Sequence, residues 1–235
     1  MTHLAEPLLA QFVNLLGAVL LLLAFAMISQ RRILSLIHLF TLQGATLALA
    51  TGVVGYVTQQ PHLYLSAALT LLLKVLLIPW LLHRVIDRLD VRWDIETLIN
   101  IPTTMLIGIA LVIFAFNLAL PIAQFSTSVA RGTLGIAVAC VLLSFLMMIT
   151  RAKAVPQVIG FLSMENGLFF AATSATYGMP MVVELGIALD VLVGMLILGV
   201  FFFQIREQFD SLDLHHLESL KEGLPAASPA HEEDG

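Results

Sequence analysis

Long apolar stretches recur along this chain, and they restrict its fold more than any other feature of the sequence. A window of about 20 apolar residues, rising about 1.5 Å per residue as a helix, crosses roughly 30 Å of hydrocarbon. With 59% apolar residues, 11% charged residues and a mean hydropathy of +0.97, the composition is typical of an integral membrane protein. Seven windows are predicted, at about 11–29, 33–57, 63–83, 97–123, 129–150, 155–177 and 182–205.

These windows are expected to be helices, because a backbone that faces lipid must satisfy its own hydrogen bonds. The strict alternation of polar and apolar residues that marks the strands of a membrane barrel is missing. The predicted fold class is therefore all-α integral membrane, with about seven transmembrane helices.

The basic residues between the windows predict the orientation of the chain. Arg131 is the single basic residue on one side, and Lys74 lies inside a window. The opposite side carries Arg31, Arg32, Arg84, Arg88, Arg92, Arg151, Lys153, Arg206 and Lys221. This bias predicts that the N-terminus is outside and the C-terminus is cytoplasmic, as in a multi-pass protein of the bacterial inner membrane.

An internal repeat is visible when the second and third windows are laid over the sixth and seventh. The segment ILSLIHLFTLQGATLALAT (33–51) aligns without gaps on VPQVIGFLSMENGLFFAAT (155–173), which pairs Gln43 with Glu165. Similarly, LKVLLIPWLL aligns on LDVLVGMLIL, which pairs Lys74 with Asp190. Three helices per unit and one connecting helix would give both units the same orientation, as in a parallel repeat; the alternative is chance similarity between Leu-rich helices.

The repeat predicts four segments. Residues 1–96 form a first three-helix unit and residues 129–209 a second one. Residues 97–128 contain the linker helix, and residues 210–235 form a cytoplasmic tail.

Four polar residues fall near the midplane of their windows: Gln43, Lys74, Glu165 and Asp190. A charge at that depth costs about 2.5 to 3.5 kcal/mol on insertion scales, so these side chains are expected to face the helix bundle, a partner or internal water. For Glu165 the alternatives are a proton-accepting site and a neutral carboxyl group that hydrogen-bonds between helices. Lys74 is expected to pair with an acid of its own chain or of a neighbour, or to carry protons itself.

Further candidates lie nearer the ends of the windows. His38 is placed to relay protons from the cytoplasmic side, although a neutral hydrogen-bonded histidine is an equal alternative. Glu184 is a candidate for the outer mouth of a proton pathway. Pro79, five residues after Lys74, is expected to disturb the helix around that lysine.

Several functions are disfavoured. The chain has one cysteine, Cys140, so a disulfide or a cysteine-ligated metal cluster within it is not expected. Phosphate-binding loops, metalloprotease motifs, catalytic triads and basic nucleic-acid-binding patches are missing from the sequence. No catalytic centre, cofactor or metal site is expected in this chain.

The segment from residue 155 to 222, which contains FLSMENGLFFAATS, resembles the hydrogenase-4 component E family, and the similarity extends over most of the chain. This family supplies membrane subunits of formate hydrogenlyase and related group 4 nickel-iron hydrogenases. The three-helix unit also looks like the K-type subunit of respiratory complex I and the C-type subunit of Mrp antiporters. Those subunits carry one buried glutamate in each of their last two helices, and Glu165 and Asp190 fall on these positions.

The resemblance implies a non-redox subunit of a proton-translocating oxidoreductase complex. Nickel-iron and iron-sulfur centres are then expected in partner subunits, beside antiporter-like subunits and lipids. Glu165, Asp190, Lys74, His38 and Glu184 would contribute to a proton path along the membrane midplane. The alternatives are a subunit of a sodium/proton antiporter without a hydrogenase, and a scaffold whose buried charges only specify helix pairing.

Overall fold

Long helices make up nearly all of the part of the chain that the structure describes. The computed structural model describes residues 2–89, 97–123 and 128–176, together with the single residues Gly186, Ala188, Leu192, Gly194 and Met195. The elements are α1 (Thr2–Ser29), α2 (Ile33–Thr58), α3 (Pro61–Thr70), a π-helical stretch (Leu71–Leu77), α4 (Ile78–Leu89), α5 (Ile101–Ala123), α6 (Ser128–Thr150) and α7 (Ala154–Thr176). By its internal packing the chain divides into two units, Met1–Gly194 and Met195–Gly235, and all of these helices belong to the first.

Five segments of the described residues are long and apolar enough to cross a membrane. They are Gln11–Ser29, Ile33–Thr58, Pro61–Arg84, Ile101–Pro121 and Thr133–Thr150. These segments match the first five predicted windows and confirm the prediction of an all-helical membrane protein within the described residues. The sixth window is occupied by α7, which carries Glu165 and Asn166 in its middle. Of the seventh window only the five single residues are described, and all of them are helical.

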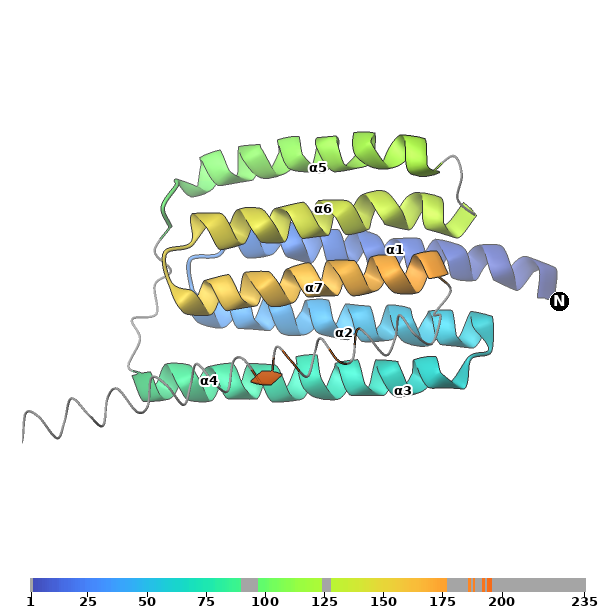
Figure 1. Ribbon diagram of the computed structural model, residues 1–235, viewed down its shortest axis with the longest axis horizontal. Helices are drawn as coiled ribbons and strands as arrows, with labels where there is room; N and C mark the ends of the chain where they lie inside the picture. Colours follow the sequence, from blue (N-terminus) through green and yellow to red (C-terminus); the bar gives the residue numbers. More distant parts are fainter. Residues whose placement is uncertain are drawn as a thin grey trace, which may run out of the picture. The chain divides into compact units, whose positions relative to one another are not determined.

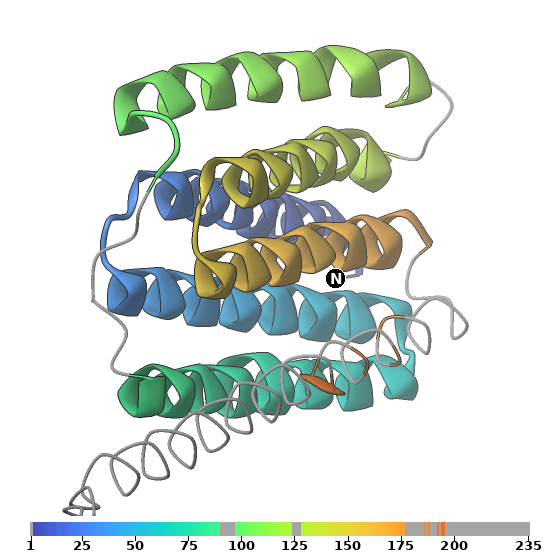
Figure 2. The same cartoon turned by 60° about the vertical axis from the view of Figure 1, so that its left-hand side comes forward.

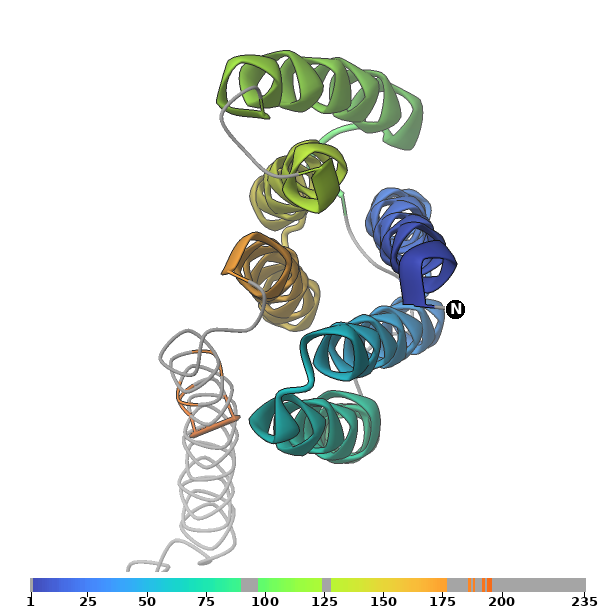
Figure 3. The ribbon, with the colours of Figure 1, turned by 90° about the vertical axis from the view of Figure 1, so that its right-hand side faces the viewer.

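The helices alternate in direction and lie side by side (Figure 1). In the first unit, α2 packs against α1, α3, the π-helical stretch and α7, whereas α6 packs against α1, α5 and α7. Seen along the helices, α1 and α2 lie opposite α6 and α7, with α3 and α4 outside α2 and α5 outside α6 (Figures 2 and 3). The α2–α7 contact brings the two halves of the chain together where both helices carry polar residues.

Corresponding helices of the predicted repeat run in the same direction. In Figure 1, α1 and α6 run one way, and α2 and α7 run the other way. The corresponding helices also contact each other, α1 with α6 and α2 with α7. This is the arrangement that a parallel repeat requires for its first two helices; the third helix of the second copy lies outside the described residues.

The sharp turn between α2 and α3 follows from its residues. Gln59 adopts a left-handed conformation, with φ of 56°, and its N–H donates to the carbonyl of Gly55, which ends α2. Pro61 then starts α3, where its fixed φ suits a helix and its missing N–H costs nothing. Two antiparallel helices therefore follow one another directly.

Arg151 was counted in the sequence as a loop charge, but it is 1% exposed and serves as a cap for α1. Its Nη2 atom donates hydrogen bonds to the carbonyls of Met27, at 3.3 Å, and Ile28, at 2.6 Å. These carbonyls lie in the last turn of α1, where backbone partners run out, and that of Met27 also accepts a 3.3 Å hydrogen bond from the N–H of Gln30. Burial lowers the pKa of the guanidinium, which nevertheless stays protonated at physiological pH. Arg151 thus joins the end of α1 to the α6–α7 turn.

Replacing Arg151 with Met is expected to lower the free energy of unfolding by about 3 kcal/mol, because charge-assisted hydrogen bonds to buried carbonyls are lost. The matched control is Arg31→Met, since Arg31 is an exposed arginine of the same end of the bundle. The single cysteine, Cys140, is buried, so thermal unfolding in detergent can be followed by its reaction with a thiol-reactive dye. Equal unfolding temperatures for the two variants would contradict the cap.

Candidate functional site

A buried polar cluster lies where α2, the π-helical stretch and α7 meet. We call it the Lys74 cluster, and it consists of Gln43, Lys74, Glu165 and Asn166. All four side chains are at most 3% exposed. The helices that carry them otherwise present mostly apolar side chains to one another, so the cluster interrupts an apolar interior.

The cluster is organised around the ammonium group of Lys74. Its Nζ atom lies 3.3 Å from Oε1 of Glu165, which is an ion pair, and donates a 2.8 Å hydrogen bond to Oδ1 of Asn166. Nδ2 of Asn166 donates to Oε1 of Gln43 at 3.2 Å. The amide of Asn166 is thereby oriented with its oxygen toward the cation and its NH₂ group toward Gln43.

Each member of the cluster lies deep in its helix. Glu165 is eleven residues from either end of α7, or about 16 Å at 1.5 Å per residue. Gln43 lies ten residues into α2, and Lys74 lies thirteen residues into the segment Pro61–Arg84. The prediction that these residues share a midplane depth therefore agrees with their contacts. For Lys74, the structure shows the first of the predicted alternatives, an acid of its own chain.

Lys74 lies in the middle of the π-helical stretch Leu71–Leu77. Pro79, as predicted, disturbs the helix here, because it has no N–H to donate and its ring would clash with the carbonyl four residues earlier. The N–H of Ile78 instead reaches back five residues, to the carbonyl of Leu73. Single π-helical turns are rare in proteins and occur frequently at functional sites.

Two further residues shape the surroundings of the lysine. A Cβ atom on Gly44 would lie 3.0 Å from Cβ of Lys74, so only glycine lets α2 come this close to the π-helical stretch. The ring of Phe169, one turn after Glu165, has its centroid 5.9 Å from Nζ of Lys74. At that distance the face of an aromatic ring attracts a cation and keeps its surroundings apolar.

Ser163 lies two residues before Glu165 on α7 but does not join the cluster. Its hydroxyl accepts a 2.9 Å hydrogen bond from Ser144 and so ties α7 to α6. Asn166, the residue directly after Glu165, does lie in the cluster, and its side-chain oxygen accepts a hydrogen bond from Lys74.

His38 pairs with a histidine that the sequence analysis did not single out. The rings of His38 on α2 and His83 on α4 have centroids 6.0 Å apart and lie nearly edge to face. Each Nδ1 atom lies within 2.8 Å of the carbonyl four residues earlier, that of Leu34 or of Pro79. This contact fixes Nδ1 as the protonated nitrogen of the neutral ring and leaves Nε2 as the basic one.

The histidine pair lies apart from the Lys74 cluster. His38 precedes Gln43 by five residues and His83 follows Lys74 by nine, which places the pair about 8 to 13 Å along the helix axes from the cluster. No hydrogen bond joins His38 to the cluster within the described residues.

Two predicted site residues, Asp190 and Glu184, lie outside the described residues. Of the two glycines that flank Asp190 at four residues on either side, Gly186 lies directly against the ring of Phe169. A Cβ atom on Gly194 would meet no described atom within 4 Å. Of these two glycines, Gly186 is therefore the one that is closely packed against a described residue.

The sequence signals for His83 and Phe169, and for the contact between Asn166 and Lys74, were weak. Asn166 stands next to Glu165 but aligns with Gly44, so the repeat gave it no polar counterpart. His83 lies near the end of its window, where a polar residue needs no explanation. Phe169 is one of many phenylalanines in apolar helices, and only the position of the ammonium group distinguishes it.

The described residues contain no group of three histidine, cysteine, aspartate or glutamate side chains close enough to hold a metal ion. The chemistry that the Lys74 cluster can perform is proton exchange. Its lysine and glutamate are the ionisable members, and its two amides are hydrogen-bonded to the ammonium group and to each other.

Breaking the ion pair from one side should be costly. Glu165→Gln removes the carboxylate that lies 3.3 Å from the ammonium group of Lys74, and Lys74→Met removes that cation from beside the carboxylate. We expect each change to lower the free energy of unfolding by about 3 kcal/mol, and the double variant to lie within about 1 kcal/mol of the wild type. The same dye reaction at Cys140 measures all four proteins. Additive losses in the double variant would show that the two side chains are not coupled.

Comparison with known proteins gives one informative relative. No family model matches the chain, and no solved structure does. Over 204 residues the chain is 33% identical to the uncharacterized protein Rv0085 of Mycobacterium tuberculosis, covering 86% of this chain and 93% of that protein. At this identity and coverage the two proteins share a fold and a common origin, and the chain therefore belongs to the same family as Rv0085.

Proposed function

We propose that this chain is a non-redox subunit of the membrane arm of a nickel-iron hydrogenase complex of the hydrogenase-4 or formate hydrogenlyase type. In this proposal the Lys74–Glu165 pair is the working part of a proton path through the midplane of the membrane. The observation that carries the proposal is the ion pair itself, which is buried halfway along apolar helices. The resemblance to component E supplies the identity of the complex.

The pair can hold a proton in two places. Oε1 of Glu165 and Nζ of Lys74 are 3.3 Å apart, so the proton can reside on the nitrogen, as an ion pair, or on the oxygen, as a neutral pair. In an apolar interior the attraction between the charges and the cost of desolvating them are both large and oppose each other. A small change in the surroundings therefore shifts the proton from one atom to the other.

The pair also allows an additional proton to enter and leave. Protonation of Glu165 beside a charged Lys74 gives the cluster a net positive charge, which the face of Phe169 and the oxygen of Asn166 help to stabilise. Gln43 fixes the orientation of Asn166 and is a positioning residue. A cluster that can gain or lose one proton while it keeps its hydrogen bonds is suited to relaying protons.

The π-helical stretch favours a relay over a rigid ion pair. A π-helical turn departs from the regular hydrogen-bond pattern of an α-helix, and such turns occur frequently at functional sites. Lys74 lies in the middle of such a stretch, and its side chain makes the contacts on which proton exchange depends. A lysine needed only to pair helices would gain nothing from this arrangement.

His38 and His83 are proposed as the entrance of the path on the arginine-rich side. Their Nε2 atoms are left available as proton acceptors, because each Nδ1 atom lies against a backbone carbonyl. The distance to the Lys74 cluster exceeds one hydrogen bond, so water must bridge it. Asp190 and Glu184 belong to the proposal on sequence grounds, because Asp190 is paired with Lys74 in the repeat and Glu184 is near the predicted outer end of the seventh window.

The proposed topology has seven spans, with the N-terminus outside and the C-terminus in the cytoplasm of a bacterial cell. The like directions of α1 and α6, and of α2 and α7, support the underlying parallel repeat. A sodium/proton antiporter subunit without a hydrogenase remains the alternative, because it would use the same buried pair. Purification of the complex with its native subunits distinguishes the two, since one contains a nickel-iron subunit and the other does not.

In membrane vesicles that hold the intact complex, Glu165→Gln is expected to lower proton movement per hydrogen turned over by at least about tenfold, the range of a lost acid–base group. The decisive variant is the double change Lys74→Met and Glu165→Gln, which should be as stable as the wild type and equally inactive in proton movement. Glu165→Asp, which keeps a carboxyl group, should retain part of the activity. A pH-sensitive dye inside the vesicles reports the movement, and copurified subunits report assembly. Normal proton movement by the assembled double variant would leave the pair a structural role only.

Replacing both His38 and His83 with Gln should slow proton movement by about tenfold, because the entrance loses its titrating groups. Stability should change by less than about 1 kcal/mol, since glutamine keeps a donor for the same carbonyls. His62→Gln is the control, because His62 lies at the opposite end of the segment Pro61–Arg84. Equal slowing by the control would show that these histidines act through packing.

A further inference from the structure

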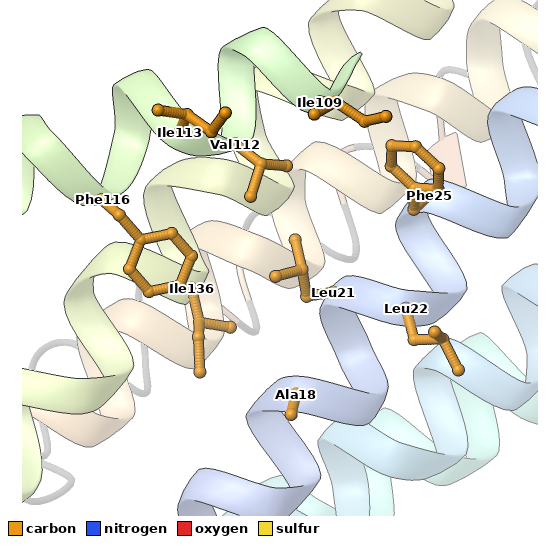
Figure 4. Close-up of a pocket in the computed structure, with 9 residues that line it drawn as sticks. All are labelled: Ala18, Leu21, Leu22, Phe25, Ile109, Val112, Ile113, Phe116 and Ile136. Atoms are coloured by element: carbon orange, nitrogen blue, oxygen red, sulfur yellow. The ribbon is translucent and has the colours of Figure 1, made fainter. Parts of the chain in front are cut away.

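An apolar groove, with a volume of about 370 Å³, lies between α1 and α5. Its walls and floor are formed by Ala18, Leu21, Leu22, Phe25, Ile109, Val112, Ile113, Phe116 and Ile136. Figure 4 shows the side chains of α1 and α5 facing each other across it, with Ile136 of α6 below. Every residue of this α1–α5 groove is apolar, and both walls belong to segments that are apolar enough to cross a membrane.

The groove exists because α5 touches α1 only locally. At Gly108 a Cβ atom would lie 3.2 Å from the ring of Phe25 and 3.8 Å from Ile28, so the two helices meet at this level. Elsewhere α5 packs on α6, where the ring of Phe116 lies against Gly135. Leu22 and Ile113 remain 69% and 58% exposed within the chain itself.

Water is not a suitable occupant of the groove, and its lining includes none of the described residues of the seventh window. Water requires two or more polar partners in a cavity, and the groove offers none. Among the described residues of the seventh window, Gly186 lies against the ring of Phe169 on α7.

The dimensions favour a hydrocarbon chain over a helix of a partner protein. The lining residues span seven positions on each wall, Ala18 to Phe25 and Ile109 to Phe116, which is about 10 Å along the axes. A transmembrane helix of a partner is about 30 Å long, about three times the length of this groove. A narrow, flexible and wholly apolar chain fits without forcing the helices apart.

Two exposed arginines lie at the appropriate distance for a lipid headgroup. Arg31 and Arg32 follow the end of α1, thirteen or more residues beyond Ala18, which corresponds to about 20 Å. Half of a bilayer with its headgroups is also about 20 Å thick. We propose that the α1–α5 groove binds one acyl chain of an anionic phospholipid of the arginine-side leaflet, with the lipid phosphate at Arg31 and Arg32.

The full chain purified in detergent and titrated with phosphatidylglycerol or phosphatidylcholine tests the proposal by native mass spectrometry. The wild type should retain one phosphatidylglycerol molecule, with a preference of about tenfold over phosphatidylcholine from the two basic side chains. Ala18→Phe fills the groove and should reduce occupancy at least about tenfold, because a bulky ring takes the volume of the acyl chain. The matched control Ala110→Phe makes the same change at an exposed position of α5 outside the groove and should bind as the wild type does.

Arg31→Gln separates the two halves of the proposal, because it should reduce the preference for phosphatidylglycerol while leaving chain binding intact. Equal lipid occupancy in Ala18→Phe and Ala110→Phe would overturn the site. So would a copurifying polypeptide lost only from Ala18→Phe, since it would identify a protein helix as the occupant. The unfolding temperature of each variant, read from Cys140, shows that the compared proteins are folded.

Discussion

The ion pair between Lys74 and Glu165 is the interaction on which the described bundle depends most. It joins the third helical segment of the chain to α7, and both side chains are buried in the middle of their helical segments. A charge buried at this depth restricts the fold severely, because each of the two helices has one face and one height at which the pair can form. The surrounding features, Gly44 against the lysine and Asn166 held by Gln43, follow from that restriction.

The same pair shows which features of the structure could be predicted from the sequence alone. Hydrophobic windows predicted five spans and the helix of α7 closely, because lipid solubility is a property of residue composition. The repeat correctly drew attention to positions 43, 74 and 165. It aligned Gln43 with Glu165 and Lys74 with Asp190, but it contained no information on which residue of one copy touches which residue of the other. That Lys74 reaches Glu165 and Asn166 is a fact of helix packing, which depends on rotation angles that hydropathy does not encode.

Two other features escaped sequence reasoning for different physical reasons. Arg151 was grouped with exposed loop charges, since the positive-inside rule counts charges without regard to their burial. His83 became visible only beside His38, because a pair of rings 6.0 Å apart on different helices is a tertiary feature. By contrast, the effect of Pro79 was predictable, because a missing N–H acts on the backbone of its own helix.

The long separation of Lys74 from its partners has a consequence for how the protein is made. Ninety-two positions of the chain separate Lys74 from Asn166, and 124 separate Met27 from Arg151. When the first three helices leave the ribosome and enter the membrane, neither the counter-charge of the lysine nor the cap of α1 has been synthesised. The first three helices therefore enter the membrane before the Lys74–Glu165 ion pair and the Arg151 cap can form. The first half of the chain is then an assembly intermediate that lacks both interactions until synthesis is well past its midpoint.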